Sequence, residues 1–194
     1  MINKYYYLVN GITLYRLVMA PLLIFFAFSR QLDLFKWLIA VSFLTDSFDG
    51  YLARRHKAVS VLGTRIDSIA DDLTIVAGLI GAVVFRYEFL KQQIVLLSLL
   101  FILYLFQLIA ALVRYGKQTG FHTYTAKIAA VLQGIFLILL FFFPEPFCLL
   151  FYVTVFFTAL DLVEEIILVF MLPQWQADIK GLFWIMKAKH SRGL

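Results

Sequence analysis

Residues 45–71 read TDSFDGYLARRHKAVSVLGTRIDSIAD, and the aspartates Asp46, Asp49, Asp67 and Asp71 stand beside apolar runs of membrane length. In helices, the members of each pair, three or four residues apart, would share one face. The loop between the pairs is short, so the two helices should be antiparallel neighbours whose carboxylates meet. Ionised carboxylates near a bilayer are costly unless compensated, and no basic cluster of matching number faces them. We therefore expect a bound divalent cation, or a pair of them.

The composition is that of a membrane protein. The chain has 194 residues, 63% of them hydrophobic, and a mean hydropathy of +0.90. A soluble domain of this length could not bury so much apolar surface. Cys148 is the single cysteine, which excludes an internal disulfide, and His56, His122 and His190 lack metal-ligand spacing. The N-terminus does not read as a cleaved signal peptide, because Arg16 interrupts it.

Six apolar stretches are long enough to cross the hydrocarbon core, which takes about 20 helical residues. They lie near residues 11–28, 34–52, 66–85, 94–113, 126–143 and 147–172. We predict an all-α integral membrane protein with six transmembrane helices, forming one domain over residues 1–172. A cytoplasmic tail, residues 173–194, would form an amphipathic interfacial helix. Its apolar face would hold Trp175, Ile179, Leu182, Phe183 and Met186. The alternative is an unstructured basic tail.

The distribution of lysine and arginine predicts the orientation. Six spans place both termini on one side, and thirteen of the seventeen Lys and Arg residues fall on that side. Cytoplasmic segments carry such an excess, so both termini and the aspartate segment should be cytoplasmic. The net charge of +5 is then mostly a consequence of topology. A nucleic-acid-binding function is excluded because no soluble basic face exists.

The residues around the aspartates suit a phosphate-bearing substrate. Carboxylate oxygens are hard ligands that favour Mg²⁺ or Mn²⁺ over zinc. Gly50, Ala53 and Gly63 have little or no side chain, which would let a bulky ligand approach the backbone. Arg54 and Arg55 close the second span, where their guanidinium groups could hold a phosphate. A site of this kind at a membrane surface indicates phosphoryl transfer on a lipid substrate.

The spacing D-x2-D-G-x2-A-R-x8-G-x3-D-x3-D, from the first aspartate to the fourth, resembles the CDP-alcohol phosphatidyltransferase motif at all eight fixed positions. Asn10, Thr13 and Arg16 are similar to the family's Asn-x-x-Thr-x-x-Arg opening. With the six-span count, the resemblance covers residues 8–172. It implies that an alcohol hydroxyl attacks the β-phosphorus of a CDP-linked substrate, usually CDP-diacylglycerol, and that CMP leaves.

The resemblance also implies a role for each motif residue. The metal ligands would be Asp46, Asp49, Asp67 and Asp71, and Asp71 would also act as general base. The CDP pocket would be lined by Asp46, Gly50, Ala53, Arg54, Gly63 and Asp67. Two Mg²⁺ or Mn²⁺ ions and a homodimer in the bilayer are expected from the family. Paired metals would independently suit this chemistry, because they neutralise charge on both phosphates.

Two further polar clusters bear on the acceptor. Arg114, Lys117 and Lys127, with His122 and Tyr124 between them, could bind the phosphate of glycerol 3-phosphate or inositol phosphate. They could equally bind no ligand and serve only as the positive charges that set the orientation of the protein in the membrane.

The second cluster, Asp161, Glu164 and Glu165, interrupts the sixth span and should face the interior or a watery cavity. These acids could bind hydroxyls or an amine of the acceptor, or pair with Arg114 or Lys127.

The neighbours of the motif leave the acceptor open. Phosphatidylglycerophosphate synthases commonly have Pro after the third aspartate and Lys after the fourth, where this chain has Ser68 and Asp72. Ser68 looks more like inositol- or serine-lipid synthases, and Asp72 departs from the arginine of inositol-phosphate enzymes. We expect a phosphorylated polyol. The alternatives are serine or inositol, or CDP-choline or CDP-ethanolamine with diacylglycerol. A metal transporter would not need the motif's glycines, alanine and arginine at fixed offsets.

Overall fold

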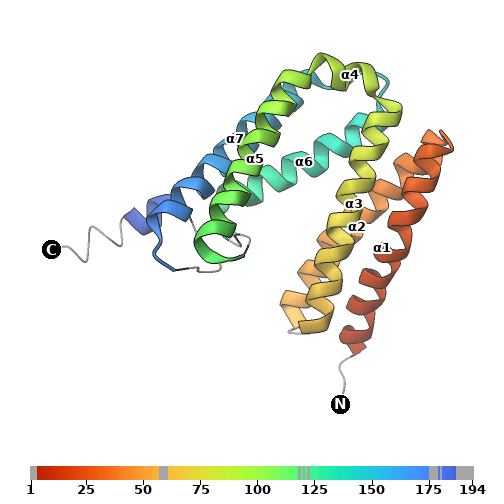
Figure 1. The fold of residues 1–194 in the computed structure, drawn as a ribbon. Helices are drawn as coiled ribbons and strands as arrows, with labels where there is room; N and C mark the ends of the chain where they lie inside the picture. Colours follow the sequence, from red (N-terminus) through yellow and green to blue (C-terminus); the bar gives the residue numbers. More distant parts are fainter. Residues whose placement is uncertain are drawn as a thin grey trace. The chain divides into compact units, whose positions relative to one another are not determined.

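The structure is a computed structural model that describes the backbone of residues 4–56, 61–117, 119, 121, 123–174, 179 and 181–186. Side chains are described for the same residues except 4–10, 12–13, 46–56, 61–69 and 71–72. The regular structure of this part of the chain is helical (Figure 1). Its helices are α1 (Lys4–Phe28), α2 (Leu32–His56), α3 (Val61–Phe85), α4 (Tyr87–Gln92), α5 (Ile94–Tyr115), α6 (Tyr124–Phe142) and α7 (Cys148–Met171).

Each of the six predicted apolar segments coincides with one helix, so the all-α prediction is confirmed. α4 was not predicted, because its six residues are too few to show a period. Within the described residues, α5 and α6 are long and apolar enough to cross a membrane. Shorter apolar helical stretches cover Leu14–Phe28 and Leu73–Phe85. α7 carries the three acids that interrupt its apolar character.

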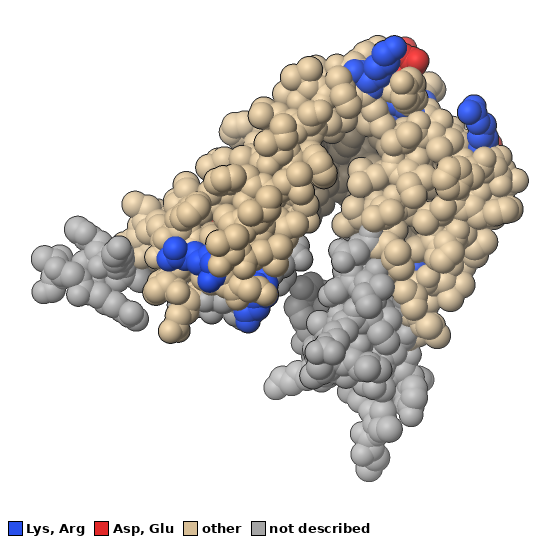
Figure 2. Space-filling model, in the orientation of Figure 1, with Lys and Arg blue, Asp and Glu red and all other residues tan. Residues whose placement is uncertain are grey.

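The outer surface of α5 is apolar along its whole length. Exposed side chains recur there every three or four residues: Val95, Leu99, Ile102, Phe106, Ile109 and Val113. Figure 2 shows that, on the face in view, the described surface along the helices is almost free of charge and that Lys and Arg gather near helix ends. Soluble monomers rarely expose such continuous apolar surface. The hydrophobic helices therefore indicate a membrane protein.

The chain divides into two compact units. The first consists of Met1–Leu90 and Leu137–Glu145, and the second of Lys91–Phe136 and Pro146–Leu194. In the first unit, α1 contacts both α2 and α3, and α2 contacts α3 (Figure 1). In the second unit, α5 packs against α7.

Small side chains bring α1 close to its neighbours. Ala20, Leu23 and Ala27 recur at helical spacing on α1 and are fully buried. Phe35 of α2 is also fully buried, and its ring centroid lies 4.9 Å from that of Phe141 in an edge-to-face contact. Apolar packing of this kind holds the first unit together.

Arg86 satisfies carbonyl groups at the end of α6. Its guanidinium donates hydrogen bonds to the carbonyl oxygens of Leu140, Phe143 and Pro144, at 2.8, 2.5 and 3.1 Å. The last carbonyls of a helix have no intrahelical partner, and an arginine can supply several donors at once. Proline ends this helix as predicted.

The tail packs against the second unit. Ile179 is buried with residues of α5 and α7, and Leu182 and Ile185 pack on the same core. Residues 182–186 form one short helical turn, on which Phe183 and Met186 are exposed. The predicted apolar face is therefore split between the protein core and the surface. Other residues of the tail and linker predictions lie outside the described residues: His122, Trp175, Lys180, Lys187, Lys189 and His190.

Gly81→Ala should destabilise the protein, whereas Gly134→Ala should not. A Cβ at Gly81 would overlap the buried ring of Phe35, lying 2.6 Å from its Cε1. Overpacking of this kind costs about 1–3 kcal/mol. Nothing lies within 4 Å of a Cβ at Gly134, so the higher helix propensity of alanine should leave stability unchanged or raise it by up to ~1 kcal/mol. Thermal unfolding in detergent, followed by circular dichroism, compares them; equal Tm shifts would contradict the close packing of α3 on α2.

Candidate functional site

The aspartate motif is carried by two helices that contact each other. α2 holds the first five motif positions and α3 the last three, and α1 packs against both helices. The motif residues are Asp46, Asp49, Gly50, Ala53, Arg54, Gly63, Asp67 and Asp71. Their backbone is helical throughout, because α2 and α3 extend beyond the predicted spans 34–52 and 66–85 and include Ala53, Arg54 and Gly63. Their side chains lie outside the described residues. The predicted contact between the two helices is confirmed, while the side-chain roles stay predictions.

The donor set of the motif fits Mg²⁺ or Mn²⁺. It offers carboxylate oxygens from neighbouring helices and neither imidazole nor thiolate, and hard divalent cations prefer oxygen. Among the side chains that the structure describes, no group of three or more His, Cys, Asp and Glu could hold a metal ion. The motif aspartates are not among those side chains.

Buried polar side chains lie one helical turn from the motif. Ser42 on α2, four residues before Asp46, is 1% exposed, and Thr74 on α3, three residues after Asp71, is 2% exposed. The Thr74 hydroxyl donates to the carbonyl one turn earlier at 2.8 Å. The Ser42 hydroxyl makes no hydrogen bond within the described residues. Sequence reasoning missed both, because a single hydroxyl in an apolar helix carries no signal of its own.

Arg16 lies on α1, the helix that contacts both motif helices. Its side chain is 2% exposed, although it belongs to one of the most polar residue types. Buried charges persist only where they are paired or functional. The sequence indicated Arg16 only through its resemblance to the family's opening motif, and the structure adds that this residue is buried.

The predicted acceptor cations lie in the second unit, where Arg114 and Lys127 make different contacts. Arg114 donates from Nε to the Leu172 carbonyl at 3.1 Å, at the end of α7. The Lys127 ammonium lies 5.4 Å from the centroid of the Tyr124 ring, within cation–π range. Lys117 is exposed. All three side chains are exposed, so a ligand in solution can reach each of them.

The acids of α7 are held by hydroxyl and amide groups. Glu165 Oε2 accepts from Gln107 Nε2 at 2.6 Å and from the Thr119 hydroxyl at 2.8 Å. Asp161 Oδ1 accepts from the Thr123 hydroxyl at 3.3 Å. Polar groups buried among apolar helices need such partners. The threonines of the segment before α6 supply them, which sequence spacing did not indicate.

Glu164 has a different role from its two neighbours. It accepts a hydrogen bond from the Thr125 hydroxyl and one from the Leu182 backbone N–H at 2.6 Å. It therefore links the start of α6, α7 and the tail. Within the described residues, neither Arg114 nor Lys127 forms an ion pair with any of the three acids. The expected pairing is not found, because the threonines and Gln107 occupy these carboxylates instead.

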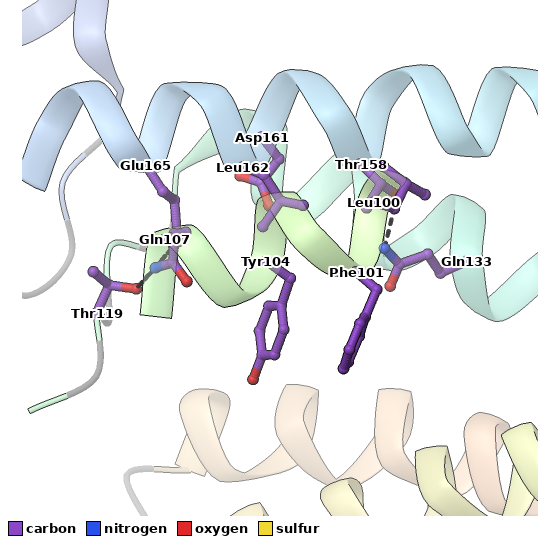
Figure 3. A pocket seen from close by; sticks show the side chains of 10 residues that line it. All are labelled: Leu100, Phe101, Tyr104, Gln107, Thr119, Gln133, Thr158, Asp161, Leu162 and Glu165. Atoms are coloured by element: carbon purple, nitrogen blue, oxygen red, sulfur yellow. Dashed lines mark hydrogen bonds between the residues drawn. The ribbon is translucent and has the colours of Figure 1, made fainter. Parts of the chain in front are cut away.

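A cavity of about 460 Å³ opens beside Asp161 and Glu165 in the second unit (Figure 3). Its polar lining consists of Gln107, Thr119, Gln133, Thr158, Asp161 and Glu165, and its apolar lining includes Phe101 and Tyr104. Gln133 Nε2 donates to the Thr158 hydroxyl at 2.8 Å. The prediction that acids in the sixth span face a cavity is confirmed for Asp161 and Glu165.

Comparison with known proteins places the chain in a family. The sequence profile described as CDP-alcohol phosphatidyltransferase matches residues 6–171. A CDP-diacylglycerol–glycerol-3-phosphate 3-phosphatidyltransferase of Wigglesworthia glossinidia brevipalpis is 32% identical over 81 residues, which are 40% of this chain and 44% of the relative. A protein with the same description from Sodalis glossinidius (strain morsitans) is 36% identical over 76 residues, 36% of this chain and 40% of the relative.

The matches differ in how much of the protein they cover. The chain spans less than half the length of the two relatives, whereas the family profile extends from α1 to the end of α7. No solved structure matches the chain. Because the profile covers most of the sequence, including the whole aspartate motif on α2 and α3, this chain belongs to the CDP-alcohol phosphatidyltransferase family.

Proposed function

We propose that this protein transfers a phosphatidyl group from CDP-diacylglycerol to a hydroxyl of glycerol 3-phosphate and releases CMP. The observation that carries the proposal is the complete aspartate motif on two contacting helices, inside the range that the family profile matches. The two relatives are described as transferases for CDP-diacylglycerol and glycerol 3-phosphate. This acceptor is also a phosphorylated polyol, the class expected from Arg114, Lys117 and Lys127.

The motif aspartates are the proposed ligands of Mg²⁺ or Mn²⁺. When bound, such ions neutralise the diphosphate and stabilise the leaving oxygen. Asp71 takes the proton of the acceptor hydroxyl. The hydroxyl oxygen then bonds to the β-phosphorus while the bond from that phosphorus to the bridging oxygen breaks, and CMP leaves with that oxygen. The CDP moiety is held by Asp46, Gly50, Ala53, Arg54, Gly63 and Asp67.

The proposed setting is a multi-pass membrane protein with six transmembrane helices. The excess of Lys and Arg on one side supports a cytoplasmic location for both termini and the motif. The exposed Phe183, Trp184 and Met186 support a tail that lies at the membrane surface. Homodimerism is proposed from the family resemblance alone.

A second candidate is a synthase that accepts inositol or serine, which Ser68 after the third aspartate favours. Purified protein with Mg²⁺ or Mn²⁺ and CDP-diacylglycerol distinguishes the candidates. CMP release is measured with glycerol 3-phosphate, inositol phosphate, inositol, serine and choline. We expect glycerol 3-phosphate to support the fastest CMP release. Faster CMP release with inositol or serine would contradict this expectation and support the second candidate.

Asp71→Asn should lower turnover by roughly 10²–10⁴-fold, because the amide cannot accept the hydroxyl proton. CMP release at saturating substrates measures this effect, and equilibrium binding of CDP should stay within a few-fold of the unsubstituted protein. Asp72→Asn is the matched control, since it removes the same charge one residue outside the motif. Equal losses in the two variants would contradict the role of Asp71.

Lys117→Gln and Lys127→Gln should each raise the KM for glycerol 3-phosphate by about 10-fold or more, since a charge-assisted hydrogen bond contributes about 1.5–3 kcal/mol. The KM for CDP-diacylglycerol should not change. Lys91→Gln, on α4, is the control for lost positive charge. An equal effect of all three substitutions on the KM for glycerol 3-phosphate would show that they act through general charge rather than by binding the acceptor phosphate.

A further inference from the structure

We propose that the cavity of the second unit, where Asp161 and Glu165 of α7 face Gln107 and Tyr104 of α5, binds a primary ammonium group. None of the residues that line this cavity belongs to the aspartate motif, and the inference goes beyond the proposed transferase function. The two carboxylates would repel the phosphate of glycerol 3-phosphate, so the cavity does not suit that part of the proposed acceptor.

Unused hydrogen-bond acceptors line the cavity. Both hydrogen bonds that Glu165 receives go to Oε2, and no donor reaches its Oε1 within the described residues. Gln107 points its Nε2 toward Thr119 and Glu165, at 2.5 and 2.6 Å. Because the neighbouring carboxylate can only accept when ionised, the amide nitrogen must be the group that faces it. The amide oxygen of Gln107 is then an acceptor, and it too has no donor among the described residues.

Gln107 presents its unused amide oxygen to the cavity. The side chain is 2% exposed and lines the cavity (Figure 3). Its Oε1 is not one of the buried polar atoms that lack a partner, so this oxygen opens to the cavity, where a ligand with several N–H donors could bond to it. A primary ammonium carries three donors and no acceptor. It could therefore bond to Gln107 Oε1 and Glu165 Oε1 together.

The charge of the cavity favours a cation. Asp161 and Glu165 are four residues apart on α7, a spacing at which like charges repel. In the described part of the chain neither acid has an ion-pair partner, since Arg114 and Lys127 make other contacts. A cationic ligand would supply the missing counter-charge. Tyr104 and Phe101 line the apolar part of the cavity, where an aromatic ring can contact a cation or its carbon chain.

The lining suits an organic ammonium better than a metal ion. A volume of about 460 Å³ is large for a single ion, and Mg²⁺ demands octahedral oxygen coordination at about 2.1 Å. Asp161 and Glu165 are not part of any three-ligand metal group among the described side chains. The ammonium could belong to a soluble amine or to the head group of an aminophospholipid, and both present the same NH₃⁺ chemistry.

The experiment uses the full chain in detergent with two probes. Ethanolamine binding is measured by isothermal titration calorimetry, and phosphatidylethanolamine binding by native mass spectrometry. Tetramethylammonium and phosphatidylcholine are the matched probes, because they carry positive charge without N–H donors. We expect either amine probe to bind at least about 10-fold more tightly than its methylated counterpart, the difference that one charge-assisted hydrogen bond makes. Binding of ethanolamine would identify a soluble ligand, and binding of phosphatidylethanolamine alone would identify a lipid.

Substitutions locate the binding in the cavity. Glu165→Gln and Asp161→Asn should each lower the affinity for the amine probe by about 10-fold or more. Glu145 is an exposed acid outside the cavity, so Glu145→Gln should leave the affinity for the amine probe unchanged. CDP binding should be the same in all three variants, which separates this proposal from the transferase assignment. The proposal is overturned if neither amine probe binds, if the methylated probes bind equally well, or if Mg²⁺ displaces the amine competitively.

Discussion

Carboxylates placed among apolar helices need a donor or a cation close by, because these surroundings solvate charge poorly. The two units of this protein meet that need differently. In the second unit, hydroxyl and amide groups hold Asp161, Glu164 and Glu165 directly. In the first unit, four aspartates gather on two helices whose motif provides one arginine, and an oxygen-preferring divalent cation is the compensation that suits them.

The packing of α1 supports the arrangement of the aspartate motif. Small and fully buried residues such as Ala20 and Ala27 allow α1 to contact α2 and α3 at the same time. The same helix carries Arg16, whose charge is buried in the first unit. A helix that joins the two motif helices can thus both hold them together and bring a positive charge into their surroundings. α1 therefore contributes both to the apolar packing of the first unit and, through Arg16, to its charge.

Much of the architecture was predictable from local patterns. Six apolar runs of membrane length became helices, since apolar residues that cannot be buried in a small soluble core form helices in the bilayer. The aspartate motif was recognisable because its eight positions have fixed spacing. α4 was not predicted, because its six residues are too few to show a helical period. The apolar face of the tail was predicted to lie wholly at the membrane, but the side chain of Ile179 is buried in the protein core.

The helical class, the membrane character and the family could be inferred without a structure, because composition and the fixed spacing of the motif are properties of the chain alone. The hydrogen-bond partners of the α7 acids, in contrast, could be identified only from the folded chain. From the sequence, Arg114 and Lys127 were possible ion-pair partners of these carboxylates. In the structure the carboxylates accept hydrogen bonds from Thr119, Thr123, Thr125 and Gln107 instead. The reason is geometric: a buried carboxylate bonds to the donors that packing brings within reach, and distance along the chain does not reveal which donors these are.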